Sequence, residues 1–381
     1  MKKLVLATLA LTTLLITSCS REDDSTSSNS VTINPADFKG ELLSGQSATL
    51  DPTQVYNLTG SFVVRGGATL TIPAGTRIEA TGGTASYIAV AQDALIYING
   101  TSSNPVVMTS GNAVKATGDW GGLVICGRAN TNKGGSTGQT ATAEVSDLTY
   151  GGTEDNDSSG VIRYLRVEYT GAAFTADKEF NGVSFFGVGN GTIVEYVQAY
   201  KSGDDGLEFF GGTVNAKYLI ALHSEDDAVD FADGFSGTLE NVFIKDVSKA
   251  GVEGSNNGDN GNATPTTNAT LKNFTILKGD LAGSEHGMYL KEGAGKWNCQ
   301  NIYIDGFTKG LKIKNSTDDP AANTNVDNGN IVFNPIYFGA SISTTSEYAG
   351  TNTTYLTTGA NTGAGNSGST PSWATGWTAG F

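Results

Sequence analysis

Acidic residues recur at a nearly constant spacing in the middle of the chain. Asp204-Asp205 precedes Gly206, and Asp226-Asp227 follows 22 residues later. Hard cations such as Ca²⁺ take several carboxylate and carbonyl oxygens, and glycoside hydrolysis uses two carboxylates. The candidate metal ligands are Asp204, Asp205, Glu208, Asp226, Asp227, Asp230 and Glu253.

Three interpretations of these acids stay open. They hold Ca²⁺, they supply an acid/base pair for sugar chemistry through Asp205, Asp226 and Asp227, or they form a solvated acidic face on a protein that is acidic throughout. Like charges that lie close together are costly unless a cation, shared protons or lysines offset them. The nearest lysines by position in the repeat are Lys249 and Lys312, and two lysines are few for this many carboxylates.

The chain offers few residues for other kinds of catalytic or metal site. Its only histidines are His223 and His286, too few for a zinc site or a Ser-His-Asp triad. The formal net charge of −15 and the absence of a basic stripe exclude nucleic acid as a partner.

The carboxylates belong to a repeated strand pattern. A segment of the form Gly/Ala-aliphatic-x-Phe occurs at 181–185, 205–209 and 227–231, with offsets of 24 and 22 residues. Weaker copies occur at 250–253, 286–290 and 309–313. A second apolar strand recurs between the copies, at 163–167, 195–197, 217–220, 240–244, 272–276 and 300–304. Such a period is what one coil of a parallel β-helix needs.

The sequence therefore predicts an all-β fold, a single-stranded right-handed parallel β-helix over residues 36–335. Residues 336–381, rich in Ser, Thr, Gly and Asn, are expected to form an irregular C-terminal cap over the last coil, or a tail. Because side chains alternate along a strand, Leu207 and Phe209 face inward and Glu208 faces outward. Asp230 and Glu253 follow the same alternation, so the three acids form a column on the outer surface. Gly and Asn are expected at the corners, where positive φ angles are needed.

The N-terminal segment has the pattern of an export signal. Lys2 and Lys3 precede an apolar run, and Leu15-Ile16-Thr17-Ser18-Cys19 resembles a bacterial lipobox. Residues 1–18 are then a lipoprotein signal peptide, Cys19 is lipidated, and 19–35 is a flexible acidic and Ser-rich tether. The acids after Cys19 resemble the surface-export signal of Bacteroidota lipoproteins, which places the protein on the outer membrane, facing out; a solvated acidic linker is the alternative.

Two further cysteines remain in this oxidising compartment. Cys126 sits in the apolar run Leu123-Val124-Ile125-Cys126, which suits a small core residue. A disulfide with Cys299 is the alternative.

One resemblance concerns the order of the acids. Asp204-Asp205-Gly206, Asp226-Asp227 and Lys312-Ile313-Lys314 resemble the catalytic series of polygalacturonases, which are also right-handed β-helices. In that family a Gly-His-Gly follows the second acidic pair by about one coil. Lys249-Ala250-Gly251 stands there instead, which puts the transfer of a catalytic role in doubt.

A second resemblance covers nearly the whole mature chain. The segments 118–123 (GDWGGL), 159–168 (SGVIRYLRVE), 204–219 (DDGLEFFGGTVNAKYL) and 233–237 (DGFSG) resemble a family of Bacteroidota secreted β-helix lipoproteins, with a pectin-lyase-like fold. Members of that family often lie near TonB-dependent outer-membrane receptors. The resemblance implies a surface lipoprotein that captures a ligand, or hands it over to such a receptor.

Three functions follow as hypotheses. The first is a ligand-binding or receptor-accessory β-helix with a calcium-binding face and a glycan or other nutrient as ligand. The second is a polysaccharide lyase or hydrolase that uses the same carboxylates; a lyase commonly needs an Arg or Lys base, and no Arg follows Arg166. The third is a structural or adhesion protein of the cell surface.

Overall fold

The computed structural model describes residues 29–134, 140–283, 286–315, 321–365 and 367–381. The expected signal peptide, Cys19 and the first part of the tether lie outside the described residues. In the described part, no helix is long and apolar enough to cross a membrane.

Almost every element is a short strand. The strands are β1 Asn29–Ser30, β2 Phe38–Leu42, β3 Gln46–Thr49, β4 Val55–Val64, β5 Thr69–Pro73, β6 Arg77–Ala80, β7 Ile88–Val90, β8 Leu95–Asn99, β9 Val106–Ser110, β10 Leu123–Cys126, β11 Ala141–Thr142, β12 Thr149–Tyr150, β13 Gly160–Glu168, β14 Val183–Phe186, β15 Ile193–Ser202, β16 Leu207–Phe210, β17 Ala216–Ser224, β18 Val229–Ala232, β19 Thr238–Val247, β20 Ala250–Gly254, β21 Asn268–Leu277, β22 His286–Leu290, β23 Lys296–Asp305, β24 Lys309–Ile313, β25 Ile331–Phe338, β26 Thr344–Ser346 and β27 Leu356–Thr358. The helical elements are η1 Gly83–Ala85, α1 Ala321–Asp327 and η2 Ser372–Ala374.

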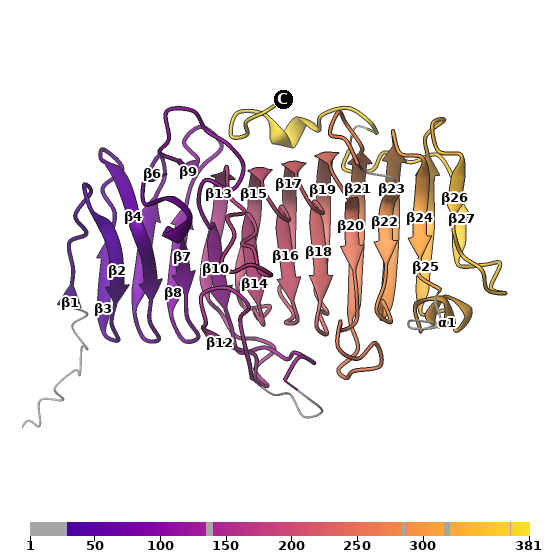
Figure 1. The fold of residues 1–381 in the computed structure, drawn as a ribbon, viewed down its shortest axis with the longest axis horizontal. Helices are drawn as coiled ribbons and strands as arrows, with labels where there is room; N and C mark the ends of the chain where they lie inside the picture. Colours follow the sequence, from indigo (N-terminus) through magenta and orange to yellow (C-terminus); the bar gives the residue numbers. More distant parts are fainter. Residues whose placement is uncertain (1–28, 135–139, 284–285, 316–320, 366) are drawn as a thin grey trace, which may run out of the picture.

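The strands stack in parallel into three ladders that run the length of the molecule (Figure 1). The long strands β13, β15, β17, β19, β21 and β23 bend in the middle, so their first halves form one ladder and their second halves another. The short strands β7, β10, β14, β16, β18, β20, β22, β24 and β26 form the third ladder. This arrangement confirms the predicted parallel β-helix.

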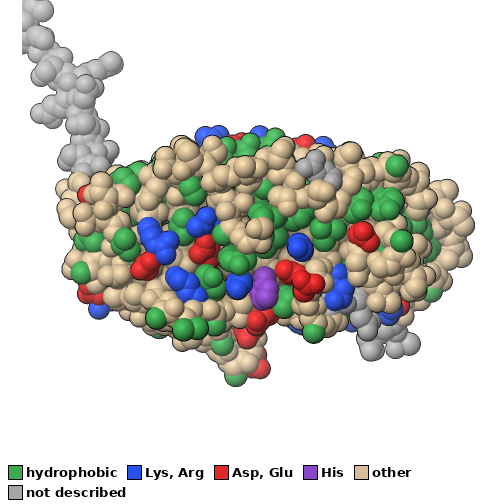
Figure 2. Space-filling view, turned by 90° about the horizontal axis from the view of Figure 1, so that it is seen from above, with side chains coloured by type: hydrophobic (Ala, Val, Ile, Leu, Met, Phe, Trp, Pro, Cys, Tyr) green, Lys and Arg blue, Asp and Glu red, His purple; other side chains and the backbone are tan. Residues whose placement is uncertain are grey.

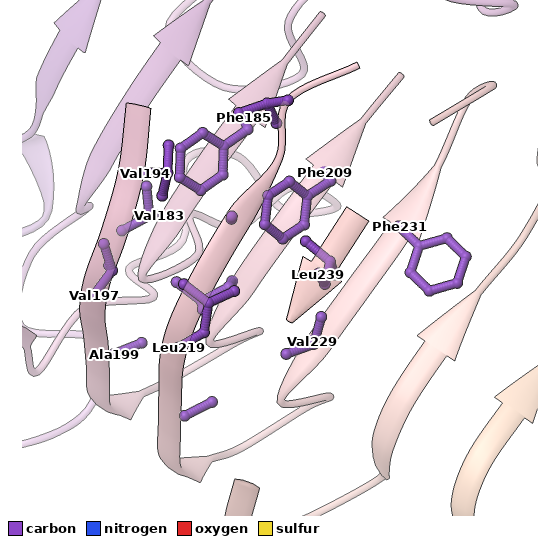
Figure 3. Packing of buried hydrophobic residues seen from close by; sticks show 14 of the residues in the cluster. Val183, Phe185, Val194, Val197, Ala199, Phe209, Leu219, Val229, Phe231 and Leu239 are labelled. Atoms are coloured by element: carbon purple, nitrogen blue, oxygen red, sulfur yellow. The ribbon is translucent and has the colours of Figure 1, made fainter. Parts of the chain in front are cut away.

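The interior is filled by side chains that repeat from coil to coil. Phe185 and Phe209 occupy paired positions of β14 and β16, and their rings stack 4.8 Å apart (Figure 3). Phe231 continues the row in β18 and packs against Trp297, with ring centroids 4.6 Å apart. The aromatic residue of the repeat therefore faces the core, as predicted, and the intervening residue faces outward.

The corner between the first two ladders confirms the expected asparagine in three coils but has tyrosine, and not glycine, in three others. Each long strand has one residue with φ between 49° and 60° at its bend, and none of these residues is glycine. The corner residues are Tyr164, Tyr196, Tyr218, Asn241, Asn273 and Asn301. The tyrosine rings stack at 4.3 and 4.4 Å, and the asparagine amides hydrogen-bond from coil to coil. Side-chain stacking thus offsets the cost of left-handed backbone that glycine would avoid.

We expect Asn273→Ala to lower the free energy of unfolding by about 2–4 kcal/mol. The Asn273 amide donates to Asn241 at 3.0 Å and accepts from Asn301 at 2.8 Å, and each lost bond costs about 1 kcal/mol. Alanine also tolerates the left-handed conformation poorly. Urea unfolding of this variant beside Asn298→Ala, an exposed asparagine of β23, measures the difference; equal effects of the two substitutions would refute a role for the corner amides.

The C-terminal region forms more than a cap over the last coil. β26 pairs with β24 and β27 pairs with β25, which extends the ladders. Residues 359–365 and 367–381, named here the C-terminal strap, then run back along the flank of the second ladder (Figure 1). Trp377 is fully buried there, edge-on to Tyr164 and Tyr196. The predicted cap is wrong for this segment because the stacked tyrosines and the apolar side chains Ile220, Leu222 and Phe243 provide an apolar surface that it covers.

Two boundary and pairing expectations are also decided. Residues 29–30 form β1, paired with β3, so the tether predicted for 19–35 ends before residue 29.

Cys126 and Cys299 are both free, buried thiols. They belong to different apolar clusters, since Cys299 faces the interior of the coils and Cys126 faces outward.

Candidate functional site

The outward face of the third ladder carries the acidic residues. The paired register places Ser184, Glu208, Asp230, Glu253, Tyr289 and Lys312 in one column, from β14 to β24. Neighbouring coils of a parallel sheet lie about 4.8 Å apart. The predicted column of Glu208, Asp230 and Glu253 therefore exists, and it ends in an aromatic and a basic residue.

A second row lies three residues earlier in each coil, where the chain turns into the third ladder. The Asn181 side chain accepts a hydrogen bond from the backbone N–H of Asp205 at 3.2 Å. The Asp205 carboxylate accepts from the N–H of Asp227 at 2.8 Å, and the Asp227 carboxylate accepts from the N–H of Ala250. These side chains satisfy backbone donors at the turn, so the row has a structural role in addition to its charge.

The two rows, together with the acids that directly precede Asp205 and Asp227, bring five of the seven predicted ligands into two groups. Carboxylate oxygens of Asp204, Asp205 and Asp226 lie within 4.8 Å of one another, and so do those of Asp205, Glu208 and Asp230. Asp205 belongs to both groups. We name these five residues the acidic cluster. Asp227 and Glu253 lie beside the cluster and belong to neither group.

The centre of the acidic cluster is buried and its rim residues Asp204 and Asp226 are half-buried, which corrects the expected exposed face. Asp205 is 6 % exposed, and Glu208 and Asp230 are each 9 % exposed. The outward face of β14 and β16 is covered next to them by the hairpin β11–β12. Tyr150 of that hairpin packs on Phe186, with ring centroids 5.2 Å apart. Position in the repeat predicts which side of a strand a residue faces, but not what an inserted hairpin places over it.

Little positive charge offsets the cluster. Lys249 pairs with Asp226, and Lys291 pairs with Glu253. In the part of the chain that the structure describes, no lysine or arginine lies within 4.0 Å of the carboxylates of Asp204, Asp205, Glu208 or Asp230. Lys312, expected to offset the column, instead lies 4.3 Å above the ring of Tyr289. On the face shown in Figure 2, acidic and basic side chains are interspersed and form no single charged patch.

Burial and mutual repulsion raise the pKa values of the cluster. Burial, followed by the charge of Glu208, raises the pKa of Asp205 well above its ordinary value. Burial and the neighbouring Asp230 do the same to the pKa of Glu208, and burial and Glu253 raise that of Asp230. At the rim, burial and Asp226 raise the pKa of Asp204 to about 7. Each shift means that the folded protein resists ionisation here unless a cation is present.

The raised pKa of Asp204 predicts the pH dependence of stability. Its ordinary value is 3.8, so between about pH 4 and 7 the folded, cation-free protein keeps a proton that the unfolded chain has lost. The folded state binds more protons, and its stability therefore falls as pH rises through this window. We expect the melting temperature in EDTA to fall over that window, and Asp204→Asn to flatten the decline. An identical decline in the variant would assign it to other acids.

Two carboxylate oxygens in the cluster lack hydrogen-bond partners although they are buried. They are Oδ1 of Asp226 and Oδ1 of Asp230. A buried, unpartnered carboxylate oxygen is costly. The donor set is oxygen only, with no His or Cys in either group, and this is the ligand chemistry of Ca²⁺ rather than Zn²⁺. The residues present therefore fit a hard divalent cation.

Sequence reasoning missed three residues that shape the cluster. Asn181 begins the row, and its amide donates to Glu208. Glu144 raises the pKa of Glu208 from the covering region, and Lys291 offsets Glu253. Asn181 stands at the same motif position as Asp205 and Asp227, so the repeat contained a signal for it. Glu144 had none, because it lies in an insertion outside the repeat.

The comparisons with known proteins agree with the architecture. A family model described as a pectate-lyase-like β-helix domain matches residues 40–378. The chain belongs to this family. No curated protein and no solved structure matches the chain. Within the pectate-lyase-like β-helix family, the match supports the fold and covers the acidic cluster, whose residues all fall inside the matched range.

Proposed function

We propose that this protein is a ligand-binding or receptor-accessory β-helix of the cell surface, held rigid by Ca²⁺ in the acidic cluster. The observation that carries the proposal is the position of the buried Asp205, which is shared by two carboxylate groups, one of which contains the unpartnered Oδ1 of Asp230. A cation there would offset the repulsion between the carboxylates and join two successive coils, through Asp205 before β16 and through Asp226 and Asp230 of the coil of β18.

Attachment to the outer membrane is part of the proposal. Its support is the lipobox-like segment that ends at Cys19, together with the place of β1 at one end of the solenoid (Figure 1). A lipid on Cys19 would tether the coils by that end and leave their long faces accessible. A TonB-dependent receptor is the proposed partner and a glycan or other nutrient the proposed ligand, both on the resemblance to Bacteroidota lipoproteins.

The second candidate is a polysaccharide-degrading enzyme that uses Asp205, Asp226 and Asp227. The membership in a pectate-lyase-like family favours it. Against it, Asp205 and Asp227 are 6 % and 3 % exposed, and each accepts a backbone hydrogen bond from the next coil. Catalytic carboxylates must reach the substrate. An assay of polygalacturonate cleavage with Ca²⁺ present separates the candidates, and unsaturated or shortened products would favour the enzyme.

Calorimetric titration of Ca²⁺ into the detergent-solubilised full chain tests the proposal. We expect saturable binding and a higher melting temperature with Ca²⁺ than with EDTA. Asp230→Asn should weaken the binding, whereas Glu240→Gln, which removes a charge from the first ladder, should not. The absence of both heat and thermal shift would overturn the cation site.

A further inference from the structure

A cavity of about 250 Å³ lies beside the acidic cluster on the third ladder. Its walls come from β20, β22 and β24, and from the turn that carries Lys249. The cavity has no role in the cation site, because none of its lining residues belongs to the two carboxylate groups.

The repeat itself creates this cavity. Ala250 pairs in register with His286, and the Asp227 carboxylate accepts the N–H of Ala250. The residues at this position in three successive coils are therefore Asp227, Ala250 and His286. The small side chain of Ala250 leaves a hollow between the larger side chains of the other two. Glu253 and Tyr289, paired in the next row, line the same hollow.

The cavity has an acidic wall and a basic wall. Asp227 and Glu253 line one side, from the turn before β18 and from β20, and Glu253 also pairs with Lys291, which does not line the cavity. Lys312 approaches from β24, with its ammonium 4.3 Å from the centre of the Tyr289 ring. No carboxylate of the described residues lies within ion-pair distance of Lys312. Lys249 lines the cavity as well, beside its partner Asp226.

The spacing of these charges defines the ligand. Glu253 pairs with Tyr289, one coil spacing of about 4.8 Å away, and the ammonium of Lys312 lies over that tyrosine. A ligand between them must offer positive and negative charges only a few bonds apart. The volume lies below the 300 Å³ or more that is typical of drug-sized ligands. A dicarboxylate would place its second carboxylate against Asp227, which has no lysine partner among the described residues, and a simple amine would leave Lys312 without an anion.

We propose that this cavity binds a small zwitterion with neighbouring ammonium and carboxylate groups, the chemistry of an α-amino acid. Glu253 and Asp227 accept from its ammonium, Lys312 and Lys249 donate to its carboxylate, and Tyr289 provides an apolar surface for the remainder. The same chemistry occurs in free amino acids and in amino-sugar acids. The inference names a ligand class for the proposed ligand capture and rests on that part of the proposed function, but not on the cation.

Thermal shift and calorimetry on the full chain, with glycine, L-lysine and L-glutamate as probes, test the proposal. We expect at least one amino acid to bind saturably, whereas ethanolamine and propionate, which carry only one of the two charges, bind at least tenfold more weakly. A titration with 2-amino-2-deoxygluconate, which carries both charges, beside glucosamine, which carries only the ammonium, distinguishes the sugar source. Equal binding of propionate, or no binding of any zwitterion, would overturn the proposal.

Two variants connect the binding to this cavity. Lys312→Gln should weaken amino-acid binding roughly tenfold or more, because it removes a charge-assisted contact. Lys314→Gln, which removes a charge from the same coil outside the cavity, should leave it unchanged. Ala250→Leu should block binding by filling the hollow. Equal effects of the two lysine variants would place the site elsewhere, and binding that persists in EDTA separates this proposal from failure of the cation site.

Discussion

Asp205→Asn is expected to abolish divalent-cation binding and to raise the stability of the cation-free protein. Asp205 is the only residue common to both carboxylate groups, so its loss weakens both at once. Substitutions that act on metal ligands only indirectly cost 10–100-fold in affinity, so we expect a loss of more than about 100-fold here. The asparagine oxygen can still accept the N–H of Asp227, which keeps the turn intact.

The two halves of this expectation have opposite signs, and a purely structural role could not produce both. In EDTA at about pH 8, where the cluster is most strongly forced to ionise, the variant should melt at a higher temperature than the parent protein. With Ca²⁺ present the order should reverse, because only the parent gains ligand stabilisation. Glu240→Gln serves as the control for a general change in net charge. A variant that melts lower than the parent in EDTA would show that the carboxylate is stabilising without a cation.

The repeat made most of the third ladder predictable. Leu207, Glu208 and Phe209 differ in polarity at every step, so alternation alone assigns their sides, and the recurrence after 22 residues sets their stacking. The same logic predicted the column with Asp230. The repeat could not predict that these acids are buried. Their burial depends on the hairpin β11–β12, whose contacts to Phe186 and Phe210 are long-range and lie outside the repeat.

The tyrosine corners and the C-terminal strap were unpredictable for a different reason. A tyrosine at positive φ is disfavoured as a single residue, and only the rings above and below it make Tyr196 acceptable. The strap then uses those rings, since Trp377 packs edge-on to Tyr164 and Tyr196. Local propensity describes one residue at a time. Cooperative stacks between coils and the segment that covers them are properties of the assembled solenoid.

Phe209→Ala is expected to destabilise the protein far more than Phe210→Ala, although the two residues are adjacent. Phe209 points into the coils, is fully buried, stacks on Phe185 at 4.8 Å and contacts Phe235 at 5.2 Å. Its removal leaves a cavity that the rigid coils cannot close, at a cost of about 3–5 kcal/mol. Phe210 stacks on Phe186 at 4.2 Å but lies on the outer face under the hairpin. The hairpin can move into the space that Phe210 leaves. The loss in free energy of unfolding is then mainly the lost burial of the apolar side chain, about 2 kcal/mol.

Amide hydrogen exchange identifies the strands that each of the two substitutions destabilises. Because a solenoid coil contacts mainly its neighbours, Phe209→Ala should speed exchange most in β14, β16 and β18 and least in β4 and β25. Phe210→Ala should speed exchange in the hairpin β11–β12 and leave the inner strands protected. Urea unfolding gives the two free energies for comparison. If Phe210→Ala proved as costly as Phe209→Ala, the hairpin would be a rigid part of the core, and the acidic cluster beside it would be closed to any ligand larger than an ion.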